Sequence, residues 1–277
     1  MNKTVEIRWH GRGGQGAKTA ALLLADVAFK TGKYVQGFPE YGPERMGAPI
    51  TAYNRISDEP ITVHSNIYEP DYVVVVDESL LETIDVTKGL KKDGAVIINS
   101  ERSKEELREH LHGYEGAVYT VNAKQISLRT LGKNYPNSPM LAAAVAVSNV
   151  MERKEFLQEM RASFQHKFAK KPEIASANVK VLESGFNYAA NVHALAVHFN
   201  VAPAQIEKGR YRTITGNKAT AWGFLAAAEK ANLPLFCGSY PITPATDILQ
   251  ELALRRDLGV KTYQAEDEIA GICTSIG

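Results

Sequence analysis

The sequence has few cysteines. The two that are present, Cys237 and Cys273, stand far apart and form no Cys-x-x-Cys spacing. Because an iron–sulfur cluster needs several cysteine thiolates, this chain cannot hold such a cluster by itself, and two separate cysteines give no disulfide framework. Any metal centre that takes part in redox chemistry is therefore expected on another chain, and we expect no metal ligands on this one.

Long apolar runs and an excess of one charge are also missing. No apolar run approaches the ~20 residues of a membrane helix, and the segment from Met1 to Glu6 lacks the apolar centre of a secretion signal. Lys plus Arg (32) nearly balances Asp plus Glu (31), which gives a net charge of +1. This balance argues against a nucleic-acid surface or a polybasic membrane contact. We therefore expect a cytoplasmic protein that binds neither nucleic acid nor membranes.

A glycine-rich turn near the start of the chain is the clearest local signal. The alternating segment Val5–Trp9 predicts a strand, and the Ala- and Leu-rich segment Ala17–Ala28 predicts a helix. Glycine lets a backbone approach a phosphate or another chain closely, and unpaired N–H groups at a helix start attract anions. We therefore predict that the glycines of this turn bind a cofactor. They are Gly11, Gly13, Gly14 and Gly16.

Two continuous apolar runs predict central strands of a parallel sheet that is covered on both faces. They are Tyr72–Asp77 and Ala95–Asn99, and each ends in a polar residue. Open α/β sheets bind ligands at the carboxyl ends of their strands, so Asp77 and Asn99 either contact a ligand or cap the turns that follow. The fold class we expect is α/β, with a Rossmann-like, open and mainly parallel sheet.

Further segments predict the elements around this sheet. Ile50–Ile56 and Ile61–Val63 alternate on either side of a polar turn, which is typical of a hairpin. Ser103 and Glu106 have the spacing of a capping box, which predicts a helix start. The segment Met140–Val150 is rich in alanine and valine and predicts a helix packed on the sheet.

The organisation of the chain changes after residue 190. We expect an α/β domain over 1–190, a helical linker over 191–212 and a second α/β unit over 213–277. This last unit is short for a complete cofactor-binding domain. We therefore expect it to be truncated or to be completed by another polypeptide.

A dinucleotide site is one interpretation of the glycine turn. Gly11, Gly13 and Gly16 satisfy the pattern G-x-G-x-x-G. The acidic residue that should bind a ribose after the second strand is missing, because Glu40 is displaced from the expected position. An NAD(P)-binding Rossmann oxidoreductase therefore stays an alternative, and a non-catalytic scaffold subunit is another.

Three further signals in the first 190 residues are the segments Ile7–Gly16, Phe38–Pro49 and Asn137–Leu141. Together they resemble the gamma subunit of the 2-oxoacid:ferredoxin oxidoreductases, the pyruvate synthase family. The last part of the chain resembles the start of the alpha subunit of the same family, which binds the pyrimidine end of thiamine diphosphate. The matching segments are Thr215–Ala219, Gly238–Pro244 and Gln264–Glu268. The resemblance implies a gamma–alpha fusion that contains only the first part of alpha.

The resemblance also implies a reaction and a set of partners. The family decarboxylates a 2-oxoacid on thiamine diphosphate, passes electrons through iron–sulfur clusters to ferredoxin, and transfers the acyl group to coenzyme A. It implies that the cofactor is shared with a beta subunit, and that magnesium and the clusters belong to the beta subunit and a ferredoxin-like delta subunit or domain. The chain alone should then be inactive, and the gamma part should pack near the coenzyme A entry, with a coenzyme A phosphate as the first ligand to test at the glycine turn.

The resemblance assigns catalytic roles to residues of the last unit. It implies that the carboxylate of Glu268, buried at a helix start, binds N1′ of the aminopyrimidine; Glu266 and Asp267 are the other candidates, and all three also suit the acidic first turn of a helix. It places Thr243 near the carboxylate or keto group of the substrate, although Thr243 also suits a helix cap. Tyr240–Ile242, in the same turn, are implied to bind the cofactor. The 2-oxoacid stays open between pyruvate or branched-chain substrates and broader 2-oxoacids, including 2-oxoglutarate.

Overall fold

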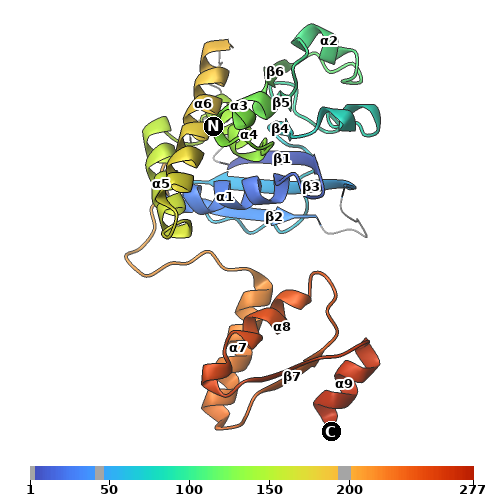
Figure 1. Cartoon of the computed structure of the whole chain (residues 1–277), viewed down its shortest axis with the longest axis vertical. Helices are drawn as coiled ribbons and strands as arrows, with labels where there is room; N and C mark the ends of the chain where they lie inside the picture. The colour runs from blue at the N-terminus through green and yellow to red at the C-terminus, as the bar shows by residue number, and fades with distance from the viewer. Residues whose placement is uncertain (1–3, 41–46, 193–200) are drawn as a thin grey trace. The chain divides into compact units, whose positions relative to one another are not determined.

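The chain divides into two units, Met1–Lys208 and Gly209–Gly277 (Figure 1). This is a computed structural model, and it describes residues 4–40, 47–192 and 201–277. The helix Pro172–Val192 extends two residues into the expected helical linker over 191–212. The other described part of that linker, residues 201–212, contains no helix. Within the described residues, no helix has the length and apolar character needed to cross a bilayer.

Six strands form the sheet of the first unit, in the order β2-β3-β1-β4-β5-β6. β1, β4, β5 and β6 run parallel, and β3 and β2 form an antiparallel edge beside β1. The predicted Rossmann-like, mainly parallel sheet is therefore confirmed. The strands are β1 (Thr4–Arg12), β2 (Tyr34–Pro39), β3 (Pro49–Ser57), β4 (Tyr72–Val75), β5 (Ala95–Asn99) and β6 (Ala117–Val121).

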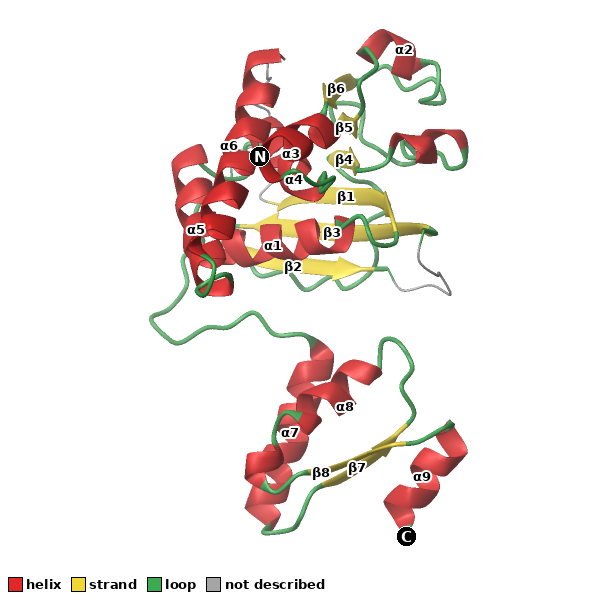
Figure 2. Cartoon of the chain, in the orientation of Figure 1, coloured by secondary structure: helices red, strands yellow, loops and turns green. Residues whose placement is uncertain are grey.

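Helices cover the sheet, and α1 lies against β1, β2 and β3 (Figure 2). Alternate residues of β4 enter separate apolar clusters, Val74 on one face and Val73 and Val75 on the other. This alternation follows from the pleat of a strand and explains the continuous apolar run. The helices are α1 (Ala17–Lys30), η1 (Glu78–Glu82), α2 (Lys104–Arg108), α3 (Ala123–Leu131), α4 (Asn137–Ser148), α5 (Arg153–Lys167) and α6 (Pro172–Val192).

Local sequence signals fix several helix ends. The capping box is confirmed, because the Ser103 hydroxyl accepts from the Glu106 N–H and the Glu106 carboxylate accepts from the Ser103 N–H. The predicted alanine-rich helix is α4, and every residue from Ser138 to Ser148 is buried. A helix that is apolar on all sides has to lie in the core, so α4 packs among other helices and the sheet.

The predicted hairpin after residue 50 is wrong. Its first arm is β3, but Ile61–Val63 forms no strand. The reason is that β3 pairs with β1 along one edge and with β2 along the other, which leaves no edge for a further strand.

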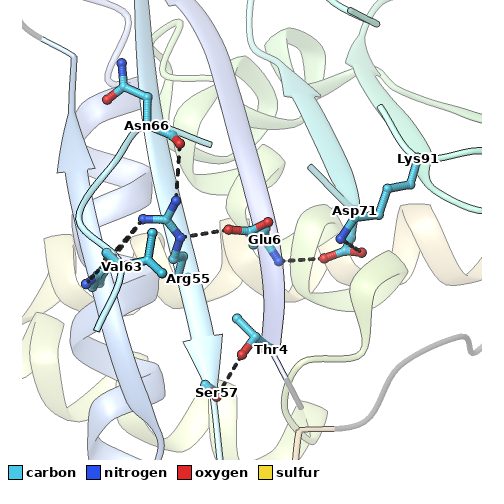
Figure 3. Close-up of polar contacts among 9 residues, drawn as sticks. Thr4, Glu6, Arg55, Ser57, Val63, Asn66, Asp71 and Lys91 are labelled. Atoms are coloured by element: carbon cyan, nitrogen blue, oxygen red, sulfur yellow. Dashed lines mark hydrogen bonds and ion pairs between the residues drawn. The ribbon is translucent and has the colours of Figure 1, made fainter. Parts of the chain in front are cut away.

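Arg55 ties the irregular segment after β3 to the sheet instead (Figure 3). Its side chain is buried and lies 2.7 Å from the Glu6 carboxylate, and it donates to the carbonyls of Val63 and Asn66 at 3.4 and 3.2 Å. Gln36 also donates to the Val63 carbonyl at 2.8 Å. A guanidinium with several fixed donors can satisfy backbone carbonyls that have no strand partner, so this segment is held without forming a strand.

The second unit has two parallel strands and three α-helices. Its core is small and contains Ala221, Leu252 and Val260, and three isoleucines of the last helix, Ile269, Ile272 and Ile276, are exposed. The elements are α7 (Gly216–Ala231), β7 (Phe236–Ser239), α8 (Thr246–Ala253), η2 (Arg256–Leu258), β8 (Lys261–Gln264) and α9 (Glu268–Ile276).

We predict that Asn54→Leu destabilises the first unit by about 1 to 3 kcal/mol. Asn54 is fully buried, accepts from the Trp9 indole N–H at 2.8 Å and donates to the Ala21 carbonyl at 2.8 Å, so it joins β3, β1 and α1. Leucine is similar in size but leaves a buried indole N–H without an acceptor. Urea unfolding of the full chain, followed by circular dichroism, measures the change.

The control for this prediction is Asn134→Leu, because Asn134 is exposed. Its stability should stay within about 0.5 kcal/mol of the wild type. An unchanged unfolding midpoint for Asn54→Leu would show that the buried amide does not contribute as we describe.

Candidate functional site

The glycine turn lies between β1 and α1 and is shaped by close contacts within the chain. Gly14 and Gly16 have positive φ angles of 93° and 84°, which favour glycine. A Cβ atom on Gly16 would lie 2.9 Å from Cγ of Asn137 at the start of α4, and one on Gly11 would lie 2.9 Å from Cβ of Ala17. These glycines therefore let β1, α1 and α4 approach one another closely.

Several amides of this turn already have partners inside the chain. The Gly13 N–H donates to the Ala48 carbonyl at 2.9 Å, and the Arg12 N–H donates to the Gln15 side-chain oxygen at 3.0 Å. At the start of α1, Gly16 supplies no side-chain cap, and an uncapped helix start is the part of the turn that suits an anion. Anion binding by the four glycines stays a prediction.

Gln15, Arg12 and Asp77 connect the glycine turn to the end of β4. The Gln15 amide nitrogen donates to the Asp77 carboxylate, which also accepts from the Ser79 N–H at 3.0 Å. Nε of Arg12 lies 3.6 Å from the same carboxylate. Burial would raise the pKa of Asp77, but hydrogen bonds from Gln15 and Ser79 and the charge of Arg12 outweigh it and lower this pKa below its ordinary value.

A cavity of about 540 Å³ opens beside the turn, at the carboxyl ends of the parallel strands. Its wall includes Asp77 and Asn99, and both residues also cap turns. Contact with a ligand stays a prediction. Asn99 donates to the Val76 carbonyl at 2.9 Å and accepts from the Ala123 N–H at 3.0 Å. From β1 the chain continues toward one edge of the sheet, and from β4 it continues toward the other edge. Open α/β sheets bind ligands at the point between two such neighbouring strands.

The strand order does not suit a dinucleotide site of the Rossmann type. In that site the strand after the first helix lies directly beside β1, whereas here the antiparallel strand β3 lies between β1 and β2. Glu40, the displaced ribose candidate, accepts a hydrogen bond from the Tyr53 hydroxyl at 2.6 Å. The acidic residue is therefore engaged at the edge of the sheet and does not line the cavity.

His10 and Arg8 are buried residues that support the fold under the site. Arg8 donates to Nε2 of His10 at 3.1 Å and to the Lys88 carbonyl at 2.6 Å. Burial and the charge of Arg8 lower the pKa of His10 to about 3, so its imidazole is neutral at pH 7. We therefore assign His10 a packing role and no acid–base role.

The second unit brings two predicted segments together. β7 and β8 are paired in parallel at Ser239 and Gln264, and the Ala265 N–H donates to the Ser239 carbonyl at 3.0 Å. Tyr240–Thr243 follows β7, and Glu266–Glu268 follows β8. Because parallel strands end on the same side of a sheet, these two segments begin side by side.

Two of the three acidic residues after β8, Asp267 and Glu268, belong to the start of α9. Asp267 is the N-cap of α9 and accepts from the Ala270 N–H at 2.7 Å. Glu268 is the first residue of α9, and its carboxylate has no hydrogen bond or ion pair among the described residues. It is exposed rather than buried as the resemblance implies, because none of the described elements covers the start of α9.

Thr243 does not cap a helix, because α8 begins at Thr246 with Ala245 as its N-cap. Thr243 is exposed, and the turn around it is tied to α7 by a hydrogen bond from the Asn217 amide to the Pro244 carbonyl at 2.8 Å. In the same turn, Tyr240 and Pro241 are half-buried and Ile242 is exposed. The Thr243 hydroxyl is therefore accessible to a ligand.

Sequence reasoning missed the contribution of Gln15, Arg12 and Asn217. Their contacts join residues that are far apart in the chain, for example Gln15 with Asp77 and Asn217 with Pro244. The only signal in the sequence was their place inside or beside segments that carry the resemblance. A contact with a distant residue leaves no local pattern.

The open sheet has a polar cavity at the carboxyl ends of its parallel strands, which is the position where α/β proteins of this architecture bind ligands. Residues 6–188 match the model of the pyruvate ferredoxin/flavodoxin oxidoreductase family, and the chain belongs to this family. It is a subunit of a pyruvate or 2-oxoacid ferredoxin oxidoreductase complex. The family assignment supports this function and does not support a nicotinamide enzyme or a scaffold.

Known relatives cover the chain to different extents. The common subunit gamma of pyruvate/ketoisovalerate oxidoreductases from Thermococcus kodakarensis is 47% identical over 183 residues, which are 66% of this chain and 96% of the relative. The crystal structure of the pyruvate oxidoreductase subunit PORC from Thermotoga maritima is 38% identical, with a TM-score of 0.59, and the match covers 68% of this chain and 97% of that one.

A third match includes the second unit. The 2-oxoglutarate:ferredoxin oxidoreductase from Magnetococcus marinus, whose structure holds 2-oxoglutarate, coenzyme A and succinyl-CoA, aligns with 99% of this chain and 45% of its own, with a TM-score of 0.79. The sequence identity is 23%, so this match shows a shared fold.

We predict that Gln15→Leu lowers the free energy of unfolding at pH 7 by about 1.5 to 3 kcal/mol, the usual contribution of a hydrogen bond to a charged group. The lowered pKa of Asp77 stabilises the folded state above the unfolded pKa of about 3.9, and this stabilisation is lost as the pH falls through the lower folded pKa. The difference between Gln15→Leu and the wild type should therefore shrink below about pH 4. Urea unfolding across this pH range measures it.

Gln158→Leu is the matched control, because Gln158 is exposed on α5. It should change stability by less than about 0.5 kcal/mol at every pH. A Gln15→Leu effect that does not vary with pH would contradict the link to Asp77.

Proposed function

We propose that the second unit supplies the aminopyrimidine half of a thiamine diphosphate site to the 2-oxoacid oxidoreductase complex. The observation that carries this proposal is the parallel pairing of β7 and β8, which places the start of Tyr240–Thr243 beside Glu266–Glu268. One segment carries an accessible hydroxyl and the other an unpaired carboxylate. The residues fit this half of the cofactor.

The other half of the cofactor requires a partner. Among the residues that the structure describes, no group of three or more His, Cys, Asp or Glu side chains could hold a metal ion. A diphosphate needs a cation or a cluster of positive charge. We therefore infer that a beta subunit supplies the magnesium and diphosphate site, and that iron–sulfur clusters on the beta and ferredoxin-like delta subunits pass electrons to ferredoxin.

When bound, thiamine diphosphate would supply a nucleophilic carbon for the keto group of the 2-oxoacid and an electron sink for its decarboxylation. Glu268 would accept a hydrogen bond from N1′ and so favour the imino form of the aminopyrimidine. Thr243 would donate a hydrogen bond to the substrate carboxylate or keto group, and Tyr240–Ile242 would line the cofactor. Glu268 needs burial for a strong interaction, and since it is exposed in this chain, the partner subunit would cover it.

We predict that Glu268→Gln in the assembled complex lowers 2-oxoacid-dependent viologen reduction by about 100-fold or more, as expected for loss of a group that assists proton transfer. Glu266→Gln is the matched control and should retain most of the activity, because Glu266 lies outside the first turn of α9. Activity that survives Glu268→Gln but is lost in Glu266→Gln would move the assignment to Glu266.

Pyruvate and 2-oxoisovalerate are the substrates we propose for this complex. The reason is that the gamma subunit from Thermococcus kodakarensis, which is 47% identical to this chain over 183 residues, is named for pyruvate and ketoisovalerate. In the same viologen assay we expect both to react faster than 2-oxoglutarate. A preference for 2-oxoglutarate would contradict this substrate assignment and leave the cofactor assignment unchanged.

The glycine turn is our proposed contact for a phosphate of coenzyme A, and the gamma part would then lie near the coenzyme A entry. The uncapped start of α1 supports this proposal, since it offers N–H groups and a positive dipole end. We expect coenzyme A to slow amide hydrogen exchange in residues 10–20 of the complex at least 3-fold, and NADH to have no effect. Protection by NADH alone would contradict it.

A further inference from the structure

α9 lies directly on the backbone of β7 at Gly238. A Cβ atom on Gly238 would lie 2.5 Å from Oγ1 of Thr274, 2.7 Å from the carbonyl oxygen of Gly271 and 2.8 Å from Oγ of Ser275. The carbonyl belongs to the helix backbone, so it cannot turn aside as a side chain can. Any residue larger than glycine at this position would therefore push the helix away from the strand.

Hydrogen bonds of Ser275 hold the helix at this distance. The Gly238 N–H donates to the Ser275 hydroxyl oxygen at 3.2 Å. The hydroxyl proton has two acceptors within reach, the Gly271 carbonyl at 3.0 Å and the Gly238 carbonyl at 3.3 Å. One side chain near the end of α9 thus contacts both the strand and the preceding turn of its own helix.

The same helix also touches the backbone that leads into the Tyr240–Thr243 turn. Gly271 is buried, and a Cβ atom there would lie 3.4 Å from Cα of Ser239 and 3.4 Å from the Tyr240 nitrogen. Gly271 and Glu268 are three positions apart, so they lie in the same turn of α9. A shift of α9 on β7 therefore moves Glu268 relative to Tyr240–Thr243.

We propose that Gly238 and Ser275 are positioning residues, which set where the Glu268 carboxylate lies relative to the Tyr240–Thr243 turn. This inference rests on the proposed function of Glu268. A carboxylate that binds N1′ has to lie within hydrogen-bond reach, about 2.6 to 3.2 Å, and a misplacement of about 1 Å can cost 100-fold in rate. The Gly238 contact sets the distance between β7 and α9, the helix that carries this carboxylate.

The experiment uses the assembled complex with Gly238→Ala, Ser275→Ala or Ser275→Thr. Gly223→Ala is the matched control, because a Cβ atom on Gly223 in α7 meets nothing within 4 Å. Three quantities are measured: the rate of C2-proton exchange of bound thiamine diphosphate, the Kd for thiamine diphosphate by equilibrium dialysis, and amide hydrogen exchange of residues 268–276 in the complex without thiamine diphosphate.

We expect Gly238→Ala to slow C2-proton exchange about 10- to 100-fold, to weaken thiamine diphosphate binding several-fold, and to speed amide exchange in α9. Ser275→Ala should show a smaller loss of the same kind, and Ser275→Thr, which keeps the hydroxyl, should restore C2-proton exchange. Gly223→Ala should match the wild type in all three measurements. Rescue by threonine would tie the loss to the Ser275 hydroxyl.

The inference is overturned if bound thiamine diphosphate exchanges its C2 proton at the wild-type rate in the Gly238→Ala and Ser275→Ala complexes but more slowly in the Glu268→Gln complex. It is the proposed function that fails if Glu268→Gln itself exchanges at the wild-type rate. Where Gly238→Ala does not assemble, Ser275→Ala and Ser275→Thr decide: equal rates in these two variants overturn the inference.

Discussion

Close approach of helices to backbone at glycine is the constraint on which both units depend. In the first unit, a Cβ atom on Gly37 of β2 would lie 2.7 Å from Cβ of Ala25 on α1, and one on Gly16 would meet Asn137 of α4. In the second unit, Gly238 lets α9 lie on β7. Since interiors are close-packed, an added methyl group at such a contact has to move a whole element. The positions of the residues near the candidate sites therefore depend on these close contacts at glycine.

Each unit gathers polar groups at the carboxyl ends of its parallel strands. In the first unit, parallel strands end at a polar cavity beside the glycine turn, where Gln15 and Asp77 join β1 to β4. In the second unit, two parallel strands end beside Glu268 and Tyr240–Thr243. Carboxyl ends of parallel strands gather polar groups in both cases, because the following turns leave the sheet on the same side. The family match over residues 6–188 covers the first of these two places.

Much of the fold could be predicted from local patterns. The continuous apolar run at β4, the Ser103–Glu106 capping box and the strand, turn and helix around Gly16 are all as predicted, since each depends on residues close in sequence. The hairpin at Ile61–Val63 failed because its formation depended on a free edge of β3, which β1 and β2 occupy. Edge availability is a property of the whole sheet, and alternation in one segment carries no information about it.

The sequence by itself determined most of the element types, the family and the residues that resemble a thiamine diphosphate site, because each of these is carried by short segments. Only the tertiary structure decided which polar groups meet: Asn54 with Trp9, Gln15 with Asp77, and Ser275 with Gly238. It also decided that Asp267 caps α9 while Glu268 stays unpaired within the described residues. The physical reason is that hydrogen bonds and close packing act over a few ångströms in space, and only the folded chain brings distant residues that close.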